Sequence, residues 1–214
     1  MGRIGRTLPS GSDEDETMKR RRKTEVKRET KETSVLLKLN LDGSGKHSIT
    51  TGIPFFDHML TLLAYHSSMD LFLKAKGDIA VDAHHTVEDV GICLGEGIRK
   101  ALGEAKGIRR YGMAMIPMDE TLVSVALDIS MRPCLVFQVK LRRSKIGTFD
   151  AELVEEFFKA LSNHSRITLH INLLHGRNSH HMIEAVFKGF GRALREAVSL
   201  DELATEVPST KGVL

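Results

Sequence analysis

The segment His84-His85-Thr86-Val87-Glu88 opens an apolar run with helical spacing, and His180-His181-Met182-Ile183-Glu184 opens a second such run. In a helix, an HHxxE segment puts its first histidine and its glutamate on one face, because they are four residues apart, with the second histidine about a third of a turn away. Each copy therefore offers two imidazoles and a carboxylate. Surface histidines near helix starts would not explain why the pattern recurs.

Imidazole and carboxylate groups in this combination favour a divalent transition metal, and two copies predict two related metal sites. A mixed set without thiolate suits Mn²⁺, Fe²⁺, Ni²⁺ or Zn²⁺, with six-coordinate Mn²⁺ favoured if a substrate fills open positions. Structural zinc sites generally use cysteine and close all four positions, so the composition predicts catalysis. HExxH is absent, and Asp89 and Ala185 after the two glutamates break the inverted HxxEH form, which argues against a zinc peptidase.

The segments around the first HHxxE alternate between strand and helix patterns. Strand-like alternation is present in residues 33–41 and 46–50, with a hairpin turn signal over residues 42–45 between them. Helical spacing follows in residues 55–65, a further strand in 71–76, and the HHxxE helix extends to about residue 102. The first half therefore reads strand, strand, helix, strand, helix.

The second half repeats this order with strands over residues 120–129, 134–141 and 167–173 and helices over 150–162 and 180–197. Tyr65-His66-Ser67 aligns with Asn163-His164-Ser165 at an offset of 98, and a shorter turn reduces the offset to 96 at the HHxxE copies. Internal duplication explains both offsets. The predicted fold class is α+β, with each half a small antiparallel sheet that has two helices on one face.

Duplication also identifies a further pair of candidate ligands. His58 and Glu156 stand at equivalent positions in the preceding helix of each half, and both residue types ligate divalent ions. The remaining histidines lack a repeated ligand pattern, and we interpret them as surface or supporting residues. Cys93 and Cys134 lie in apolar stretches without CxxC spacing, which predicts two reduced core thiols.

Composition excludes several classes of protein. A chain of 214 residues with 41% hydrophobic residues is typical of a globular protein, and no apolar run approaches the ~18 to 20 residues of a membrane span. The charged N-terminus does not resemble a signal peptide, so we expect a cytoplasmic protein. A formal net charge of +3 is too small to imply nucleic acid binding.

The two ends of the chain have loop-like composition. Residues 1 to about 28 contain an acidic run and a basic run with little to bury, which predicts a solvated arm; we assign residues 1–23 to a disordered tail and 24–214 to the folded domain, with Met18 as an alternative start. Residues 206–214 combine Ser209, Thr210 and Lys211 with glycine, as an anion site requires, although a mobile tail has the same composition.

Several separated motifs together resemble one known family. Gly52-Ile53-Pro54-Phe55-Phe56-Asp57-His58-Met59-Leu60, residues 82–89, residues 176–181 and Pro208-Ser209-Thr210-Lys211-Gly212 are similar to the imidazoleglycerol-phosphate dehydratases of histidine biosynthesis, from about residue 24 to the end. The resemblance implies repeats of the ribosomal protein S5 domain 2-like kind over about residues 30–115 and 116–200, followed by a C-terminal substrate loop at 206–214.

The resemblance also implies the reaction, the cofactor and the assembly. Imidazoleglycerol phosphate would be dehydrated to imidazoleacetol phosphate by a homo-oligomer of 24 subunits, with two Mn²⁺ ions in each active site and active sites between subunits. A ring bound to Mn²⁺ would serve as an electron sink for removal of the carbon-bound proton. The partners would be a small phosphorylated imidazole substrate and other copies of the chain, with no nucleic acid and no membrane.

The family's site residues can be placed on this sequence by position. One metal would take His58, His85, His180 and Glu184, and the other His84, Glu88, His181 and Glu156, where Glu156 departs from members that have histidine. Glu32 would transfer the proton, with His85 and Glu184 also catalytic. Substrate would contact Glu32, His58, Arg110, Arg132, Lys188, Ser209, Thr210 and Lys211, of which the basic residues would hold the phosphate.

Three other functions are compatible with parts of this pattern. A metal-dependent phosphohydrolase would also need two metals and a phosphate site. A shell assembled by metal without turnover would need only the ligands. A nucleic-acid-binding module ranks last, because basic residues cluster in the N-terminal arm and the sequence has no Trp and two Tyr for base stacking.

Overall fold

The computed structural model describes residues 22–201, 203, 204, 206–212 and 214, and its two halves have the same order of elements. The first half contains β1 (Lys23–Glu29), β2 (Thr33–Asn40), β3 (His47–Thr50), α2 (Pro54–Ser67), β4 (Asp70–Gly77) and α3 (His84–Leu102). The second contains β5 (Tyr111–Met118), β6 (Thr121–Asp128), β7 (Cys134–Gln138), α4 (Leu153–Ser165), β10 (Thr168–His175) and α5 (Ser179–Val198), with the short pair β8 (Lys145–Ile146) and β9 (Phe149–Asp150) inserted before α4.

The strands form two four-stranded sheets with matching topology. Their orders are β1-β2-β4-β3 and β5-β6-β10-β7. Corresponding strands occupy corresponding places, which confirms the predicted α+β class and its duplication. In each sheet one pair is parallel, β3 with β4 and β7 with β10, and the remaining pairs are antiparallel.

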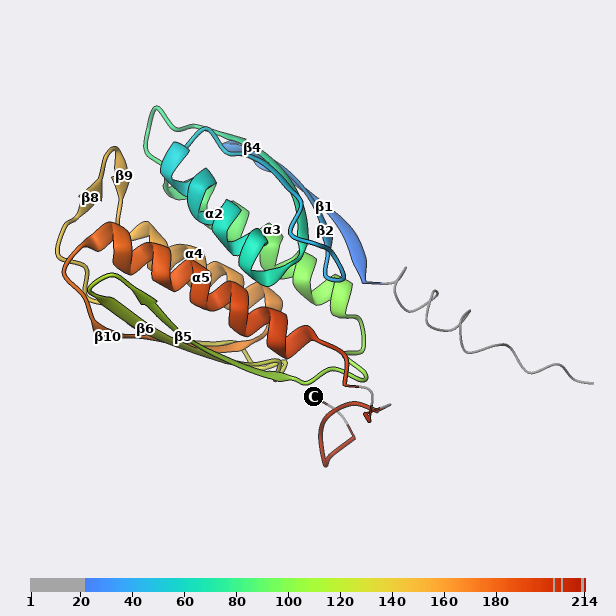
Figure 1. The fold of residues 1–214 in the computed structure, drawn as a ribbon. Helices are drawn as coiled ribbons and strands as arrows, with labels where there is room; N and C mark the ends of the chain where they lie inside the picture. Colours follow the sequence, from blue (N-terminus) through green and yellow to red (C-terminus); the bar gives the residue numbers. More distant parts are fainter. Residues whose placement is uncertain (1–21, 202, 205, 213) are drawn as a thin grey trace, which may run out of the picture.

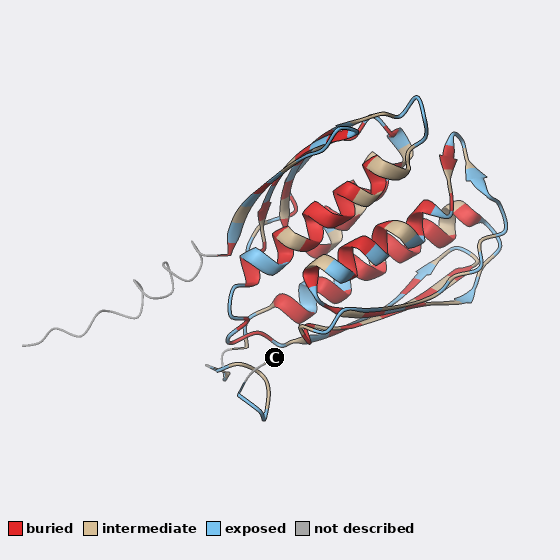
Figure 2. Cartoon of the chain, turned by 180° about the vertical axis from the view of Figure 1, so that it is seen from behind, coloured by how far each residue is buried: buried red, intermediate tan, exposed pale blue. Residues whose placement is uncertain are grey.

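The helices lie between the two sheets, so that the sheets form the outer layers (Figure 1). Buried residues follow the helix faces turned toward the interior and the inner faces of the strands (Figure 2). The helices pair across the duplication, since α2 packs against α5 and α3 against α4. Their core includes the buried rings of Phe157, Phe158 and Phe187, whose centroids lie 5.0 to 5.3 Å apart.

Two glycines at equivalent places allow these helix pairs to approach closely. A Cβ on Gly95 would lie 2.6 Å from the carbonyl oxygen of Leu161, and a Cβ on Gly191 would lie 2.9 Å from that of Leu63. Gly95 and Gly191 differ by 96 positions, and Leu63 and Leu161 by 98, so the contacts repeat with the offsets of the duplication. The two helix crossings are therefore copies of one packing arrangement.

Several local predictions were wrong. Residues 23–28 were assigned to the arm, but Lys23–Glu29 forms β1, and buried Arg22 donates a hydrogen bond of 2.7 Å from Nη2 to the carbonyl oxygen of Val198. The part of the predicted tail over residues 1–21 lies outside the described residues. Residues 111–118 were unassigned and form β5.

The predicted hairpin at residues 42–45 is also wrong. β3 does not return along β2; it pairs in parallel with β4, with Ile49 opposite Leu73. Asp70 at the start of β4 fixes the connection by accepting hydrogen bonds from the backbone N–H groups of Ser44 and Lys46, at 2.8 and 3.0 Å from Oδ1. The segment between β2 and β3 therefore reverses the chain without pairing the two strands, and α2 connects β3 to its parallel neighbour β4.

The two cysteines have different surroundings. Cys93 is buried in α3, as predicted, and burial raises the pKa of its thiol to about 12. Cys134 was predicted to be a core thiol, but it is exposed at the start of the edge strand β7. Within the described part of the chain, no helix has the length and apolar character needed to span a membrane.

Candidate active site

Both HHxxE segments begin helices, as predicted. His84 is the first residue of α3, and His180 is the second residue of α5. Asp82 Oδ1 accepts a hydrogen bond of 2.8 Å from the backbone N–H of His84, and Asn178 Oδ1 accepts one of 2.9 Å from that of His180. Because side-chain oxygens at these positions satisfy the unpaired donors of a first turn, both histidine pairs begin helices at a fixed place.

The second HHxxE forms a three-residue cluster with the helix packed beside it. Glu184 Oε2 lies 3.1 Å from Nε2 of His180 and 3.7 Å from Nε2 of His58, which comes from α2. Glu184 is buried, whereas the two histidine side chains are 41% and 48% exposed. Ligand atoms of the three residues all lie within 4.8 Å of one another.

Lys188 lies one turn beyond Glu184 and contacts its other oxygen, with Nζ 2.6 Å from Oε1. Burial acts to raise the pKa of Glu184, but hydrogen bonds from Lys188 and His180 outweigh burial and lower it. Glu184 is therefore held as a carboxylate. Lys188 therefore lies at this cluster, and it does not line the cavity that contains the other residues predicted to hold the phosphate.

The second histidine of each pair contacts a carboxylate that was not among the predicted site residues. His85 Nδ1 lies 3.1 Å from Asp78 Oδ2, and His181 Nδ1 lies 2.9 Å from Glu120 Oε2. The hydrogen bond with Asp78 raises the pKa of His85. Hydrogen bonds from His181 and from two backbone N–H groups lower the pKa of Glu120.

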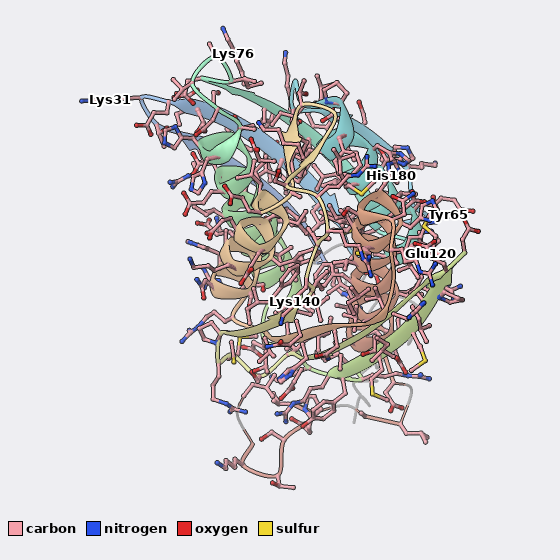
Figure 3. All side chains as sticks on the ribbon, turned by 90° about the vertical axis from the view of Figure 1, so that its left-hand side faces the viewer. Lys31, Tyr65, Lys76, Glu120, Lys140 and His180 are labelled. Carbon is pink, nitrogen blue, oxygen red and sulfur yellow. The ribbon has the colours of Figure 1, made fainter. Side chains whose placement is uncertain are left out.

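The side chains Glu120 and His180 lie on the same side of the molecule (Figure 3). Sequence reasoning missed Glu120 because the duplication was aligned only from the first helix of each half onward. Extending the comparison to the preceding strands would have found it. Thr33 begins β2 and Thr121 begins β6, so Glu32 and Glu120 occupy the same position before equivalent strands.

The predicted ligands His84, Glu88 and Glu156 lie on α3 and α4, the helix pair equivalent to α5 and α2. Among the described residues they do not form a cluster like that of His58, His180 and Glu184. Glu156 instead contacts Lys159 on its own helix, with Oε2 3.3 Å from Nζ. In this repeat the structure brings together helices but not a complete ligand set.

Glu32 lies in the turn between β1 and β2, close to the start of α3. Thr30 Oγ1 accepts hydrogen bonds from the backbone N–H groups of Glu32 and Thr33, at 3.1 and 2.9 Å. Thr33 is opposite Gly77 in the sheet, which brings the turn beside Asp78 and its partner His85. The Glu32 side chain is exposed, and its charge also acts to raise the pKa of His85.

A second candidate region is a cavity of about 800 Å³ that is bounded by the C-terminal loop. Most of the predicted phosphate-binding residues line it, namely Arg110, Arg132, Ser209, Thr210 and Lys211. The rest of the lining consists of Tyr111, Pro208 and Leu214. Its lining also shows that residues 208–211 fold back against the second sheet.

The two arginines of this cavity have different surroundings. Arg110 donates from Nε and Nη2 to the carboxylate of Asp128, at 2.7 and 3.1 Å, and from Nη1 to the carbonyl oxygen of Pro208 at 2.8 Å. Arg110 therefore holds the loop in place. In the described part of the chain, neither Arg132 nor Lys211 has an acidic side chain within ion-pair distance, so their charges remain available to an anion.

The histidine cluster and the basic cavity lie at opposite ends of α5. His180 is in the first turn, whereas the backbone N–H of Arg110 donates to the carbonyl oxygen of Ala197 in the last turn. A rise of about 1.5 Å per residue separates the two ends by roughly 25 Å. A small molecule cannot contact both regions of one chain.

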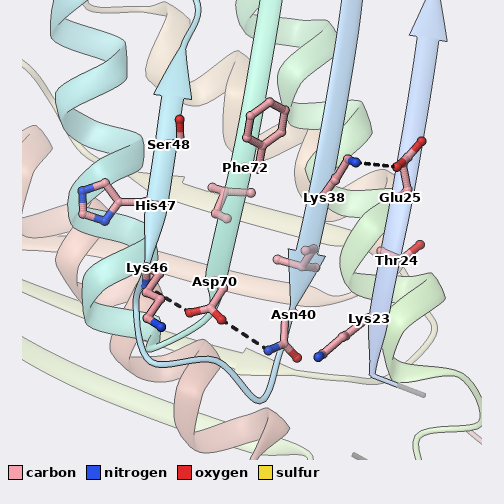
Figure 4. A pocket seen from close by; sticks show the side chains of 12 residues that line it. Lys23, Thr24, Glu25, Lys38, Asn40, Lys46, His47, Ser48, Asp70 and Phe72 are labelled. Carbon is pink, nitrogen blue, oxygen red and sulfur yellow. Dashed lines mark hydrogen bonds and ion pairs between the residues drawn. The ribbon is translucent and has the colours of Figure 1, made fainter. Parts of the chain in front are cut away.

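A further cavity of about 700 Å³ lies on the outer face of the first sheet (Figure 4). Its strand residues are paired with one another, as in the contacts of Lys38 with Glu25 and of Asn40 with Asp70. The predicted site residues do not line this cavity. Its position therefore does not connect it with the histidine cluster.

The cluster of His58, His180 and Glu184 has the donors and the spacing that one divalent ion requires. Ligand distances of about 2.0 to 2.2 Å around a metal put neighbouring ligand atoms about 3 to 4.5 Å apart, and the separations here are 3.1 and 3.7 Å to Glu184. The fold and the site thus define a duplicated α+β protein with a histidine-carboxylate centre suited to metal binding.

Comparisons with known proteins agree with this class. The family model described as imidazoleglycerol-phosphate dehydratase matches residues 51–194. An imidazoleglycerol-phosphate dehydratase from Exiguobacterium is 61% identical over 191 residues, which cover 89% of this chain and 97% of the relative. One from Acetivibrio thermocellus is 58% identical over 193 residues, covering 90% and 99% of the two chains.

Solved structures give the same assignment. The imidazoleglycerol-phosphate dehydratase of Staphylococcus aureus matches with a TM-score of 0.77 at 42% identity, covering 84% of this chain and 99% of that one. The enzyme of Pyrococcus furiosus, in complex with (S)-C348, matches with a TM-score of 0.77 at 40% identity over 88% and 100% of the chains. The chain belongs to the imidazoleglycerol-phosphate dehydratase family, an enzyme family of histidine biosynthesis.

Proposed function

We propose that this enzyme dehydrates imidazoleglycerol phosphate to imidazoleacetol phosphate, with two Mn²⁺ ions in each active site, in sites formed between copies of the chain. The observation that carries the proposal is the separation of the histidine cluster from the basic cavity along α5. The substrate has an imidazole ring and a phosphate joined by a three-carbon chain, which is too short to bridge two ends of one helix. One copy must therefore supply ring-binding groups and another the phosphate-binding groups.

The predicted ligand sets agree with such an assembly. His58, His180 and Glu184 meet within one chain, whereas His85, assigned to the same ion, is held by Asp78 at the start of the other HHxxE helix. A neighbouring copy can bring its own His85 to the cluster. The second set, His84, Glu88, His181 and Glu156, is divided in the same way, and closed symmetry completes every site equally. A homo-oligomer of 24 subunits, located in the cytoplasm, is the form that we propose.

Mn²⁺ held by these residues would bind the ring as an imidazolate, whose electrons would help hydroxide to leave the carbon attached to the ring. The protein must then move one proton and fix one charge. Glu32 projects from the turn beside His85 and removes the carbon-bound proton. Its carboxylate is suited to this role because it is exposed and has no hydrogen-bond or ion-pair partner among the described residues. Hydroxide leaves the carbon attached to the ring and the proton leaves the middle carbon, which gives the enol that becomes the keto phosphate.

The phosphate lies in the basic cavity in this proposal. Arg132 and Lys211 supply charge, and the hydroxyls of Ser209 and Thr210 supply hydrogen bonds. Arg110 keeps the loop closed through Pro208. Binding at this end holds the substrate, so that its reacting carbon is positioned against Glu32 from the neighbouring copy.

The test is a chelation and reconstitution experiment on the purified enzyme. Elemental analysis should find about two Mn²⁺ per chain, chelation should abolish formation of the keto phosphate, and returned Mn²⁺ should restore it. His85→Ala and His181→Ala should lose metal and activity together, whereas Glu32→Gln should keep the metal and lose turnover. Release of inorganic phosphate would instead indicate the phosphohydrolase. Full activity without metal would refute the proposal.

A further inference from the structure

The second histidine of each HHxxE segment is held through the same ring nitrogen. Nδ1 of His85 lies 3.1 and 3.2 Å from the two oxygens of Asp78, and Nδ1 of His181 lies 2.9 Å from Oε2 of Glu120. A carboxylate accepts a hydrogen bond and cannot donate one when ionised, so each contact favours the tautomer that carries its proton on Nδ1. In that tautomer Nε2 has a free lone pair.

Glu120 is fixed by contacts besides the one to His181. Its Oε1 accepts hydrogen bonds from the backbone N–H groups of Arg177 and Asn178, at 3.0 and 2.7 Å, immediately before α5 begins. Oε1 is thus committed to the backbone, and Oε2 alone faces the imidazole. The carboxylate therefore has one orientation, and it sets the orientation of the ring.

The two carboxylates come from different places in the duplicated fold. Leu37 is opposite Leu73 in the first sheet, and Val125 is opposite Ile171 in the second, which gives β2 and β6 an offset of 88 positions. Glu32 is therefore the counterpart of Glu120. Asp78, in contrast, comes from the connection between β4 and α3.

We infer that Asp78 and Glu120 are positioning residues that present Nε2 of His85 and His181 to the metal, and that Asp78 performs in the first repeat the task that Glu120 performs in the second. This inference rests on the proposed metal sites. Because Asp78 holds His85, the carboxylate of Glu32 is left without a hydrogen-bond or ion-pair partner among the described residues. One acidic position of the duplication thus orients a ligand, and its counterpart is free to act on substrate.

The test combines Mn²⁺ titration calorimetry with the imidazole ¹⁵N spectrum of histidine-labelled, metal-free protein. In Glu120→Gln the amide oxygen stays with the two backbone donors, so the NH₂ group faces Nδ1 of His181 and requires it to accept. The proton then moves to Nε2, the ligand atom. We expect Mn²⁺ affinity to fall about 10- to 100-fold at the affected site and the His181 signal to change to the Nε2–H form.

Asp78→Ala should weaken Mn²⁺ binding in the same range and release the His85 tautomer. Asp78→Asn should have a smaller effect, because no backbone donor among the described residues fixes one of its oxygens, and the amide can turn its own oxygen toward Nδ1. Glu32→Gln is the matched control, since it makes the same change at the equivalent position; it should leave Mn²⁺ affinity within about twofold. Thermal unfolding of each variant checks that the fold is retained.

Unchanged Mn²⁺ affinity and an unchanged His181 tautomer in folded Glu120→Gln would overturn the inference, even with a wild-type protein that binds two ions. Failure of the wild type to bind Mn²⁺ would refute the proposed function instead, and the tautomers would still be measurable.

Discussion

Arg28 on β1 and Asp89 on α3 are joined by an ion pair in which Nε lies 2.7 Å from Oδ1. The other oxygen of Asp89 accepts the hydroxyl hydrogen of Thr33 at the start of β2. A single buried carboxylate thus ties both strands that flank the turn of Glu32 to the helix that begins with the first HHxxE. The place of Glu32 relative to His85 depends on this contact.

The substitution Asp89→Asn should destabilise the enzyme. The amide would lack the negative charge that pairs with Arg28, and it would keep only one of the two oxygens that accept hydrogen bonds. Water cannot easily replace these contacts, because the Asp89 side chain is only 9% exposed. We expect a loss of about 1 to 3 kcal/mol in the free energy of unfolding, measured by urea denaturation. Glu96→Gln removes a surface carboxylate paired with Lys100 on the same helix and should cost under about 0.5 kcal/mol. Equal losses for the two variants would contradict this account.

Gly95→Ala should separate the helices α3 and α4. The added methyl would lie 2.6 Å from the carbonyl oxygen of Leu161, and backbone on both sides prevents an easy adjustment. Thermal or urea unfolding should show a loss of about 1 to 3 kcal/mol. Gly97→Ala is the control on the same helix, because its nearest atom is a terminal methyl carbon of Leu37 at 3.0 Å and alanine improves helix propensity. A Gly95→Ala protein as stable as Gly97→Ala would exclude a close crossing.

Asp70 should make a pH-dependent contribution to stability. Burial acts to raise its pKa, but the hydrogen bonds from Ser44 and Lys46 outweigh burial and lower it. A carboxyl whose pKa is lowered in the folded state stabilises the protein above its unfolded pKa of about 3.9, and the contribution is lost as pH falls through the folded value. Asp70→Asn should therefore lose about 1 kcal/mol at pH 7 and progressively less below about pH 4. Urea denaturation at several pH values measures this, and a difference in the free energy of unfolding between the wild type and Asp70→Asn that does not change with pH would refute it.

Sites formed between copies predict complementation between inactive variants. His180→Ala damages the cluster and Lys211→Ala the cavity, so each homo-oligomer should have greatly reduced activity. When the two chains are co-assembled in equal amounts, about a quarter of the sites should combine an intact cluster with an intact cavity. Activity per site should recover to roughly that fraction of wild type at saturating substrate. Activity no higher than the mean of the two separate variants would show that each chain uses its own cavity.

The sequence predicted the parts of the fold whose pattern is local. The two HHxxE helices and the strands β2, β4 and β6 were found because apolar spacing and caps are properties of short segments. β1 was missed because Val26 is its only fully buried hydrophobic residue and charged residues alternate around it. β5 contains Gly112 and Pro117, which interrupt a strand pattern. The parallel pairing of β3 was missed because it depends on how α2 returns the chain.

The site was predictable to a similar degree. Histidines and glutamates at repeated spacing identified His58, His180 and Glu184, which do meet in space. Asp78 lies between the strand predicted over residues 71–76 and the helix that begins at His84, and its contact with His85 depends on a fold of the loop that no periodicity reports. The separation of the cavity from the cluster follows from tertiary packing, since Arg110 reaches the end of α5 through β5.

The exchange of helix partners between the repeats has a consequence for how the two halves depend on each other. Because α2 packs against α5 and α3 against α4, each half places its helices against those of the other half and not against each other. A polypeptide of half this length would expose one apolar helix layer and could bury it only against a second copy of itself. The chain is therefore packed as two half-chains related like the partners of a symmetric dimer, each of which supplies the helix surface that the other must cover.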